Sequence, residues 1–385
     1  MIPYNRHNLF PQDKTLIKNL LNGRILTQGP LVNKFENTIK NYVNSKYAIA
    51  TTNASTALHC ACASLNIEKT DIVWFSNITF ISSASCSFHF TKKINFLDID
   101  LNTFNIDINN LEKKLVLANK KKSLPKLIII THLGGNPCDM KRIYKLKKKY
   151  KFKIIEDASH ALGSRLGNIY IGSCKYSDFT IFSFHPLKNI TSFEGGIITT
   201  NNLNYNNRIL KLREHGIVRF KNNNKGYNWK YKINSIGYNF RMSEIHAALG
   251  LSQFKNLDNI IKKRNQIAKS YTRYLKENNN LIIQTKMGFS AYHLYIVLLK
   301  KKISLKKKSQ LFKFFFKNNI MLQSHYIPLN KHKLIKKIVG KQRLFSCKKS
   351  EFYYSNAVSL PIFYSLKNSQ ILKVINKLYL GLSKL

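Results

Sequence analysis

Short β-prone apolar runs recur through the first 200 residues of this chain, and most of them are separated by segments long enough for a helix. We count seven such runs, which begin at Tyr47, Val73, Ile94, Lys126, Lys153, Phe179 and Ile197. Strands that alternate with helices form a parallel sheet with helices covering its faces. The pattern therefore predicts an α/β fold built on a large, mostly parallel sheet of seven strands.

The stretch of residues 178–200 places a lysine on an exposed loop between two of these strands. The apolar run 179–184 carries Ser183 near its end, and Lys188 follows in a polar turn. The next β-prone run, 197–200, comes after a pair of glycines. This order of strand, polar turn and strand holds Lys188 just beyond a strand end.

The preceding run, residues 153–156, ends at Asp157, and His160 follows in the segment EDASHALGS. An acid after one strand, with a hydroxyl and a lysine after its neighbour, is the set of groups that pyridoxal phosphate (PLP) needs. The lysine forms a Schiff base with PLP, the acid pairs with the pyridinium nitrogen, and hydroxyl and backbone N–H groups hold the phosphate. We therefore predict that Lys188 is catalytic and that Asp157, Ser183 and Lys188 bind the cofactor.

These two segments resemble those of the DegT-type sugar-nucleotide aminotransferases, a branch of the fold-type I PLP enzymes. Within that branch, GSCKYSDFTIFSFHPLKNIT is similar to the 4-aminotransferases of pseudaminic acid biosynthesis. The resemblance runs from Ile2 to about Leu366, almost the whole chain. It implies an aspartate aminotransferase-like fold, with an arm and a large PLP-binding domain over residues 1–256. A connecting helix and a smaller C-terminal α+β domain would occupy residues 257–385.

The resemblance implies further cofactor-binding residues. Ala54 and Ser55 open a helix of small residues whose N-terminus approaches the phosphate closely, although the residues taken alone favour an ordinary helix cap. Phe80 matches the ring that stacks on the pyridine, and His160 matches a position near the phenolic oxygen; packing alone is the alternative for each. Asn239 in GYNFRM matches the residue that reaches the cofactor phosphate of the partner subunit, which implies a homodimer with shared sites.

The resemblance also implies substrate-binding residues, namely Tyr4, then Arg24, Ile25, Leu26 and Thr27, and finally Gln323, Ser324, His325 and Tyr326. The implied reaction moves nitrogen from L-glutamate to the C4 keto group of a UDP-linked 4-keto-6-deoxy-N-acetyl-hexosamine. Its product would be UDP-4-amino-4,6-dideoxy-N-acetyl-beta-L-altrosamine. An alternative is another nucleotide-linked 4-keto sugar of the perosamine or bacillosamine type. Family members with histidine at the lysine position are dehydratases, so Lys188 favours amino transfer.

One residue departs from the family pattern in the loop after Lys188. The family usually has a small residue before Glu-Gly-Gly, whereas this chain has Phe193 before Glu194. If the Phe193 ring points into the site, it narrows the sugar pocket. The departure therefore bears on the identity of the substrate and leaves the cofactor chemistry unaffected.

The net charge of +46 raises the alternative of a nucleic-acid-binding protein. Lysine shares A/T-rich codons with the abundant Asn, Ile, Phe and Tyr, so genome composition explains the excess of positive charge, and we expect no specific nucleic acid partner.

No apolar run approaches the roughly 18 residues of a membrane span and the start lacks a signal peptide, so we expect a cytoplasmic protein without a membrane partner. The six scattered cysteines predict buried, reduced thiols and no metal site. A scaffold protein without PLP is the remaining non-catalytic alternative.

Overall fold

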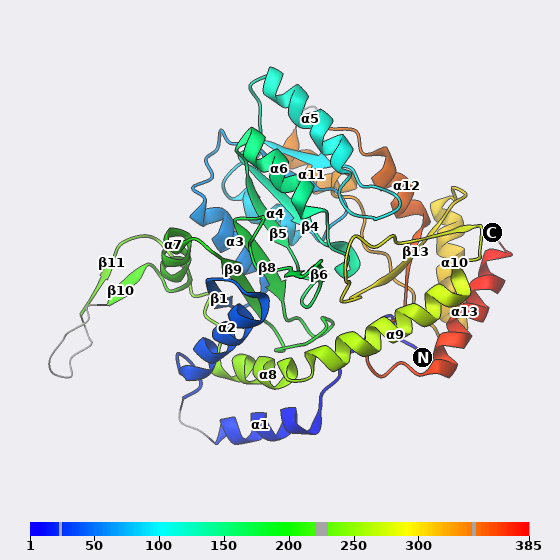
Figure 1. The fold of residues 1–385 in the computed structure, drawn as a ribbon, viewed down its shortest axis with the longest axis horizontal. Helices are drawn as coiled ribbons and strands as arrows, with labels where there is room; N and C mark the ends of the chain where they lie inside the picture. Colours follow the sequence, from blue (N-terminus) through cyan, green and yellow to red (C-terminus); the bar gives the residue numbers. More distant parts are fainter. Residues whose placement is uncertain (23–24, 220–229, 341–343, 385) are drawn as a thin grey trace.

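A seven-stranded sheet forms the centre of the computed structural model, which describes residues 1–22, 25–219, 230–340 and 344–384 (Figure 1). The strand order is β1-β9-β8-β5-β4-β2-β3. The bounds are Tyr47–Thr51 (β1), Val73–Ser76 (β2), Ile94–Leu97 (β3), Leu127–Thr131 (β4), Lys153–Asp157 (β5), Phe179–Ser183 (β8) and Gly196–Thr200 (β9). Strand β9 is antiparallel to β1 and β8, and the remaining pairs are parallel. The predicted fold class and its seven strands are confirmed, with two strand starts displaced by one residue.

The register of the parallel strands brings polar residues to one edge of the sheet. Thr131 at the end of β4 pairs with Asp157 at the end of β5, and Asp157 pairs with Ile181 in β8. Ser183 ends β8 two residues later. Because parallel strands end on the same side, these side chains surround one opening, as is usual for ligand sites in α/β sheets.

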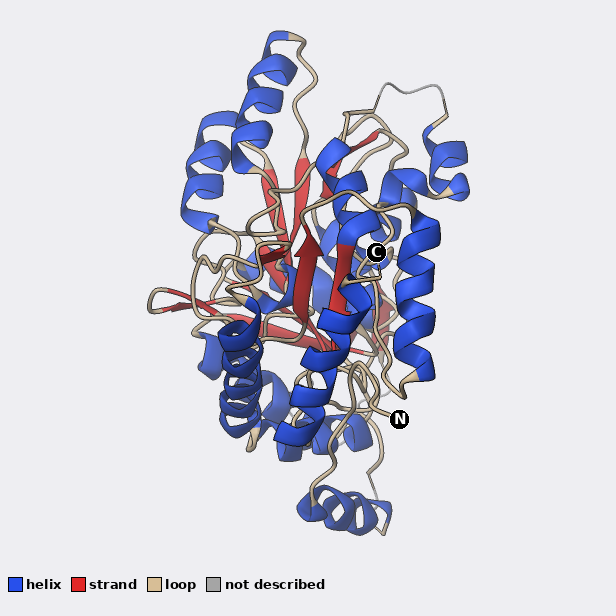
Figure 2. Cartoon of the chain, turned by 90° about the vertical axis from the view of Figure 1, so that its right-hand side faces the viewer, coloured by secondary structure: helices blue, strands red, loops and turns tan. Residues whose placement is uncertain are grey.

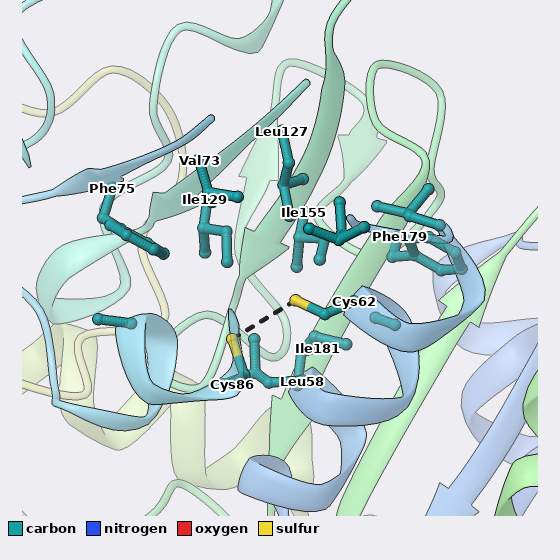
Figure 3. Close-up of a cluster of buried hydrophobic side chains, with 14 of the residues drawn as sticks. Leu58, Cys62, Val73, Phe75, Cys86, Leu127, Ile129, Ile155, Phe179 and Ile181 are labelled. Carbon is teal, nitrogen blue, oxygen red and sulfur yellow. Dashed lines mark hydrogen bonds between the residues drawn. The ribbon is translucent and has the colours of Figure 1, made fainter. Parts of the chain in front are cut away.

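Alternation along the strands gives the sheet two apolar faces. Leu127, Ile129 and Ile155 face one side, where α3 and α4 contribute Leu58, Cys62 and Cys86 to the core (Figure 3). Ile128, Ile130 and Ile154 face the other side and pack with residues of α5 and α6. These four helices have the bounds Ala54–Ser64 (α3), Ser82–Phe88 (α4), Ile108–Lys120 (α5) and Met140–Tyr150 (α6).

A third core covers the β1 and β9 end of the sheet, where Phe35 and Ile39 of α2 pack with Ala247 of α8. The helices at this end are α2 (Pro30–Val43), α7 (Leu203–Arg213) and α8 (Glu244–Phe254). Helix α1 (Pro11–Leu21) stands apart from the body, below it in Figure 2. Its Asp13 accepts hydrogen bonds from Ser252 and Gln253 of α8, which hold α1 in place.

The long helix α9 (Leu257–Leu275) leads into the C-terminal part of the chain. A small antiparallel sheet, β12-β13-β14, packs there with α9, α10, α12 and α13, whereas α11 packs against the core of the large sheet. The bounds are Leu281–Ile283 (β12), Tyr295–Leu299 (β13), Ala357–Leu360 (β14), Leu305–Lys317 (α10), Lys333–Val339 (α11), Lys348–Asn356 (α12) and Asn368–Leu382 (α13). The N-terminal arm joins this core through Ile2, which is buried and bridges to Ile320. The division at residue 257 remains a prediction.

Two hairpins complete the fold, and neither was predicted. One is β6 (Arg165–Leu166) with β7 (Ile169–Tyr170), and the other is β10 (Ile217–Arg219) with β11 (Tyr231–Ile233). The second hairpin projects from the body at the left of Figure 1. The remaining elements are the 3-10 turns η1 (Leu133–Gly135) and η2 (Leu329–Lys331).

In the described ranges, no helix combines the length and apolar character that crossing a membrane requires. All six cysteines are buried, and none of them forms a disulfide.

Candidate active site

A pocket of about 460 Å³ opens at the carboxyl ends of β4, β5 and β8. The N-terminal arm, the start of α3, the loops after these strands and the segment before η2 all contribute to its walls. The predicted site residues that line it are Tyr4, Ala54, Ser55, Phe80, Asp157, His160, Ser183, Lys188, Gln323, Ser324, His325 and Tyr326. A larger groove of about 860 Å³ follows α9, but its lining residues do not come from these strand ends.

Asp157 is buried at the floor of this pocket and is held by hydrogen bonds to both carboxylate oxygens. The Ser83 hydroxyl on α4 donates to Oδ2, and the Ser159 N–H donates to Oδ1 at 3.1 Å. Ser83 lies 2.8 Å from the Thr79 hydroxyl, which accepts from Thr131 at 2.7 Å. This chain of hydroxyls fixes the direction in which the carboxylate faces the pocket.

Lys188 lies on the loop after β8, where its backbone N–H donates to the His185 carbonyl at 2.9 Å. Burial lowers the pKa of Lys188 to about 8, although the nearby charge of Asp157 opposes this shift. The loop is tied to the N-terminal arm, because the Asn5 side chain donates to the Leu187 carbonyl at 2.7 Å. The arm therefore helps to position the lysine.

His160 stands beside Lys188 with a defined set of partners. The Gly134 N–H donates to its Nδ1 at 3.3 Å, so Nε2 carries the hydrogen and donates to the Tyr326 hydroxyl at 3.1 Å. Its ring lies 4.3 Å from the His293 ring. Burial and the neighbouring charge of Lys188 lower the pKa of His160 well below its ordinary value. The imidazole of His160 beside the amine is therefore neutral.

The start of α3 forms another wall of the pocket. Asn53 caps this helix by accepting from the Thr56 N–H at 2.9 Å, and Ala54 and Ser55 follow at the first helical positions. Gly196 of β9 packs directly against the cap, since a Cβ atom there would lie 2.3 Å from the Asn53 carbonyl oxygen. The glycine thus lets the sheet approach a helix N-terminus, which favours anions.

The groups in the pocket fit PLP. Lys188 offers an amine for the aldehyde, Asp157 a carboxylate for the ring nitrogen, and the start of α3 a site for the phosphate. Phe80 is 55% exposed, and its ring, 6.0 Å from that of Tyr326, presents a flat apolar face to the cavity. The individual cofactor roles remain predictions.

Several predicted site residues lie elsewhere. Ile25, Leu26 and Thr27 are exposed and do not line this pocket, and the Leu26 carbonyl accepts from the Glu244 N–H at 3.0 Å. Asn239 is also exposed and outside the pocket of its own chain. Arg24 lies outside the residues that the structure describes.

Phe193 does not line the pocket, so the condition for a narrowed sugar site is not met within one chain. Its backbone has a φ of 61°, and its side chain is 41% exposed. The ring lies 6.1 Å from that of His246 on α8 and not beside the lysine.

Sequence reasoning missed several residues that complete the pocket. Thr79, Thr131, Glu194 and His293 line it, and Ser83 holds Asp157 from behind. Thr131 stands at a strand end next to Asp157, a position that the strand pattern marks. His293 precedes its strand and lies against His160 only after the chain folds, so no local pattern marks it.

Comparisons with known proteins agree with this geometry. Residues 10–379 match the model of the DegT/DnrJ/EryC1/StrS aminotransferase family. A UDP-4-amino-4,6-dideoxy-N-acetyl-beta-L-altrosamine transaminase of Campylobacter jejuni is 34% identical, with 97% of this chain and 96% of that protein aligned. GDP-perosamine synthase of Escherichia coli O157:H7 is 28% identical, with 98% of each chain aligned.

Among solved structures, Helicobacter pylori PseC, an aminotransferase involved in the biosynthesis of pseudoaminic acid, superposes with a TM-score of 0.89. The two sequences are 27% identical, and the alignment covers 100% of both chains. Because the family model spans nearly the whole chain, and the sheet and pocket agree with it, this protein belongs to the DegT/DnrJ/EryC1/StrS aminotransferase family.

Proposed function

We propose that this protein transfers the amino group of L-glutamate to the C4 keto group of a UDP-linked 4-keto-6-deoxy-N-acetyl-hexosamine, with PLP as cofactor. The product would be UDP-4-amino-4,6-dideoxy-N-acetyl-beta-L-altrosamine, a precursor of pseudaminic acid. The observation that carries the proposal is the presence of Lys188 and Asp157 in one pocket, close enough for the carboxylate charge to affect the lysine pKa.

Different residues of the pocket would hold different parts of the cofactor. Asp157 would keep the ring nitrogen protonated, and its charge-assisted hydrogen bond is about twice as strong as a neutral one. Phe80 would cover one face of the ring, and Ser55, Ser183 and the start of α3 would hold the phosphate. PLP, when bound, supplies an electron sink that stabilises negative charge on the substrate carbon next to the nitrogen.

Lys188 would move the proton that transamination requires. Since burial lowers its pKa to about 8, part of the amine is neutral near neutral pH and can accept a proton from the substrate carbon. The resulting ammonium can return the proton at the cofactor side. Because His160 is neutral, no positive charge on its ring repels this ammonium.

The substrate assignment draws support from the Campylobacter and Helicobacter relatives, whose names specify this product or pathway. The chain carries 64 lysine and arginine residues against 18 aspartate and glutamate residues, a field that favours glutamate and a nucleotide diphosphate. The alignment with GDP-perosamine synthase favours a second candidate, a GDP-linked 4-keto sugar. Assays with UDP- and GDP-linked 4-keto sugars, each with glutamate, decide between them. Exclusive use of the GDP sugar would reject the first assignment.

We further propose a homodimer in which Asn239 completes the partner's site. Near Asn239 the chain exposes a series of apolar side chains: Tyr231 (54%), Ile233 (64%), Ile236 (81%) and Tyr238 (45%). Contiguous exposed apolar side chains commonly mark an interface.

A further inference from the structure

A buried lysine lies directly behind the segment of residues 323–326. Lys308 is in the first turn of α10, yet it is only 6% exposed. Its Nζ donates to the Ser324 hydroxyl at 3.0 Å and to the Tyr354 carbonyl. Within the described part of the chain, burial lowers its pKa to about 8 with no carboxylate opposing the shift, so the amine remains mostly protonated at pH 7.

Burying an ammonium without a carboxylate is unfavourable, and a lysine at a helix start can usually reach water. Here the Tyr354 and Phe312 rings flank the Nζ atom, at 4.9 and 5.9 Å, and compensate part of the cost through cation–π attraction. The position of the charge is therefore well defined. It points at Ser324.

Ser324 connects this lysine to the reaction pocket. It lines the pocket of about 460 Å³ and also a neighbouring cavity of about 390 Å³ that Lys308 lines. An ammonium can only donate, so the Ser324 oxygen is the acceptor and its own hydrogen remains available. The charge behind it polarises the hydroxyl and strengthens it as a donor. Such a donor prefers an anionic oxygen to a neutral carbonyl.

We propose that Lys308 is a positioning residue that orients Ser324 to donate a hydrogen bond to a diphosphate oxygen of the nucleotide sugar. This inference rests on the proposed function, because it assigns one end of the same substrate to one end of the pocket. A carboxylate beside Lys308 would cancel the attraction of its positive charge for the diphosphate, and among the described residues none opposes the effect of burial on its pKa.

The test measures the affinity of the PLP-loaded protein for UDP by calorimetry. Lys308→Met and Ser324→Ala should each weaken UDP binding about tenfold, in line with a hydrogen bond to a charged group. The double variant should be no weaker than either single one, because the two residues act as a unit. Lys306→Met, which removes an exposed charge from the same helix turn, should change the affinity less than about twofold.

A second measurement distinguishes a role of Lys308 in orienting Ser324 from a general loss of folded structure. The first half-reaction with glutamate should keep its rate in Lys308→Met, because this half-reaction does not use the diphosphate and Lys308 does not line the reaction pocket. Unchanged UDP affinity in Ser324→Ala, additive losses in the double variant, or a parallel loss in the glutamate half-reaction would overturn the proposal, as would an unaltered protein that does not bind UDP. Ser324→Ala removes one hydroxyl only and decides the question if Lys308→Met does not fold. Failure to convert any UDP-linked keto sugar would instead reject the proposed function, independently of UDP binding.

Discussion

The Ser83 hydroxyl donates a hydrogen bond to Oδ2 of Asp157, and so joins helix α4 to the carboxylate at the floor of the pocket. This contact links residues 74 positions apart in the sequence. Thr79 and Thr131 extend it into a line of hydroxyls across β4 and the loop after β2. The carboxylate that would pair with the PLP ring nitrogen is thus held by buried neighbours before any ligand binds.

Ser83→Ala should lower kcat by about 10- to 100-fold, because a hydrogen bond to a charged group contributes about 1.5 to 3 kcal/mol. Steady-state kinetics with glutamate and the keto sugar would measure the loss. Ser87→Ala is the matched control, since Ser87 is also buried on α4 but donates only to the Ala84 carbonyl, at 3.0 Å. Equal losses in the two variants would show that Ser83 acts through packing alone.

The capture of PLP by the apoprotein should follow the ionisation of Lys188. The neutral amine is the nucleophile, so the rate should rise with pH and level off above about 8, the pKa that burial gives this lysine. Stopped-flow absorbance at several pH values would follow the reaction. Asp157→Asn removes the charge that raises this pKa and should move the midpoint to lower pH. A midpoint near 10.5, the ordinary value for lysine, would contradict the account.

Arg264 should be important for stability. It is 2% exposed, and its guanidinium donates to the carbonyls of Tyr292, His293 and Ile362 and to the Asn5 side chain. Arg264→Met leaves the three carbonyl oxygens without their donor, and should lower the free energy of unfolding by about 3 kcal/mol or more. Urea denaturation measures the change.

Arg273→Met provides the control for this prediction, because Arg273 is exposed on the same helix, α9. Its effect on the free energy of unfolding should stay within about 0.5 kcal/mol. Comparable destabilisation by the two substitutions would mean that the buried contacts of Arg264 contribute little.

Mixed dimers test whether sites are shared between subunits. Lys188→Ala and Asn239→Ala should each be severely impaired alone. If Asn239 serves the partner's site, mixing and refolding the two variants in equal amounts should restore up to about a quarter of the original activity, since half of the dimers regain one complete site. Activity that stays at the level of the separate variants would place Lys188 and Asn239 in the same subunit's site.

Local pattern was sufficient to predict the sheet and the pocket floor. Apolar runs such as those beginning at Val73 and Phe179 are buried on both faces, and this composition identifies parallel strands without knowledge of their neighbours. Asp157 and Lys188 follow such strands directly, so their convergence at one sheet edge could be expected.

Other features depend on contacts between distant segments, which local pattern does not encode. Ser83 reaches Asp157, and His293 reaches His160, only in the folded chain. The hairpin β10–β11 was missed because each of its strands has only three residues, too few to show a period.

The central claim is that Lys188 is the amine that binds PLP. Reduction of the PLP-loaded protein with borohydride, followed by proteolysis and peptide mass spectrometry, tests it most directly, because the chain offers many other lysines. The account predicts one phosphopyridoxyl group per chain, on the peptide that contains Lys188, and none in Lys188→Ala. Label on another lysine, label spread across surface lysines, or a colourless protein that takes up no PLP would contradict it.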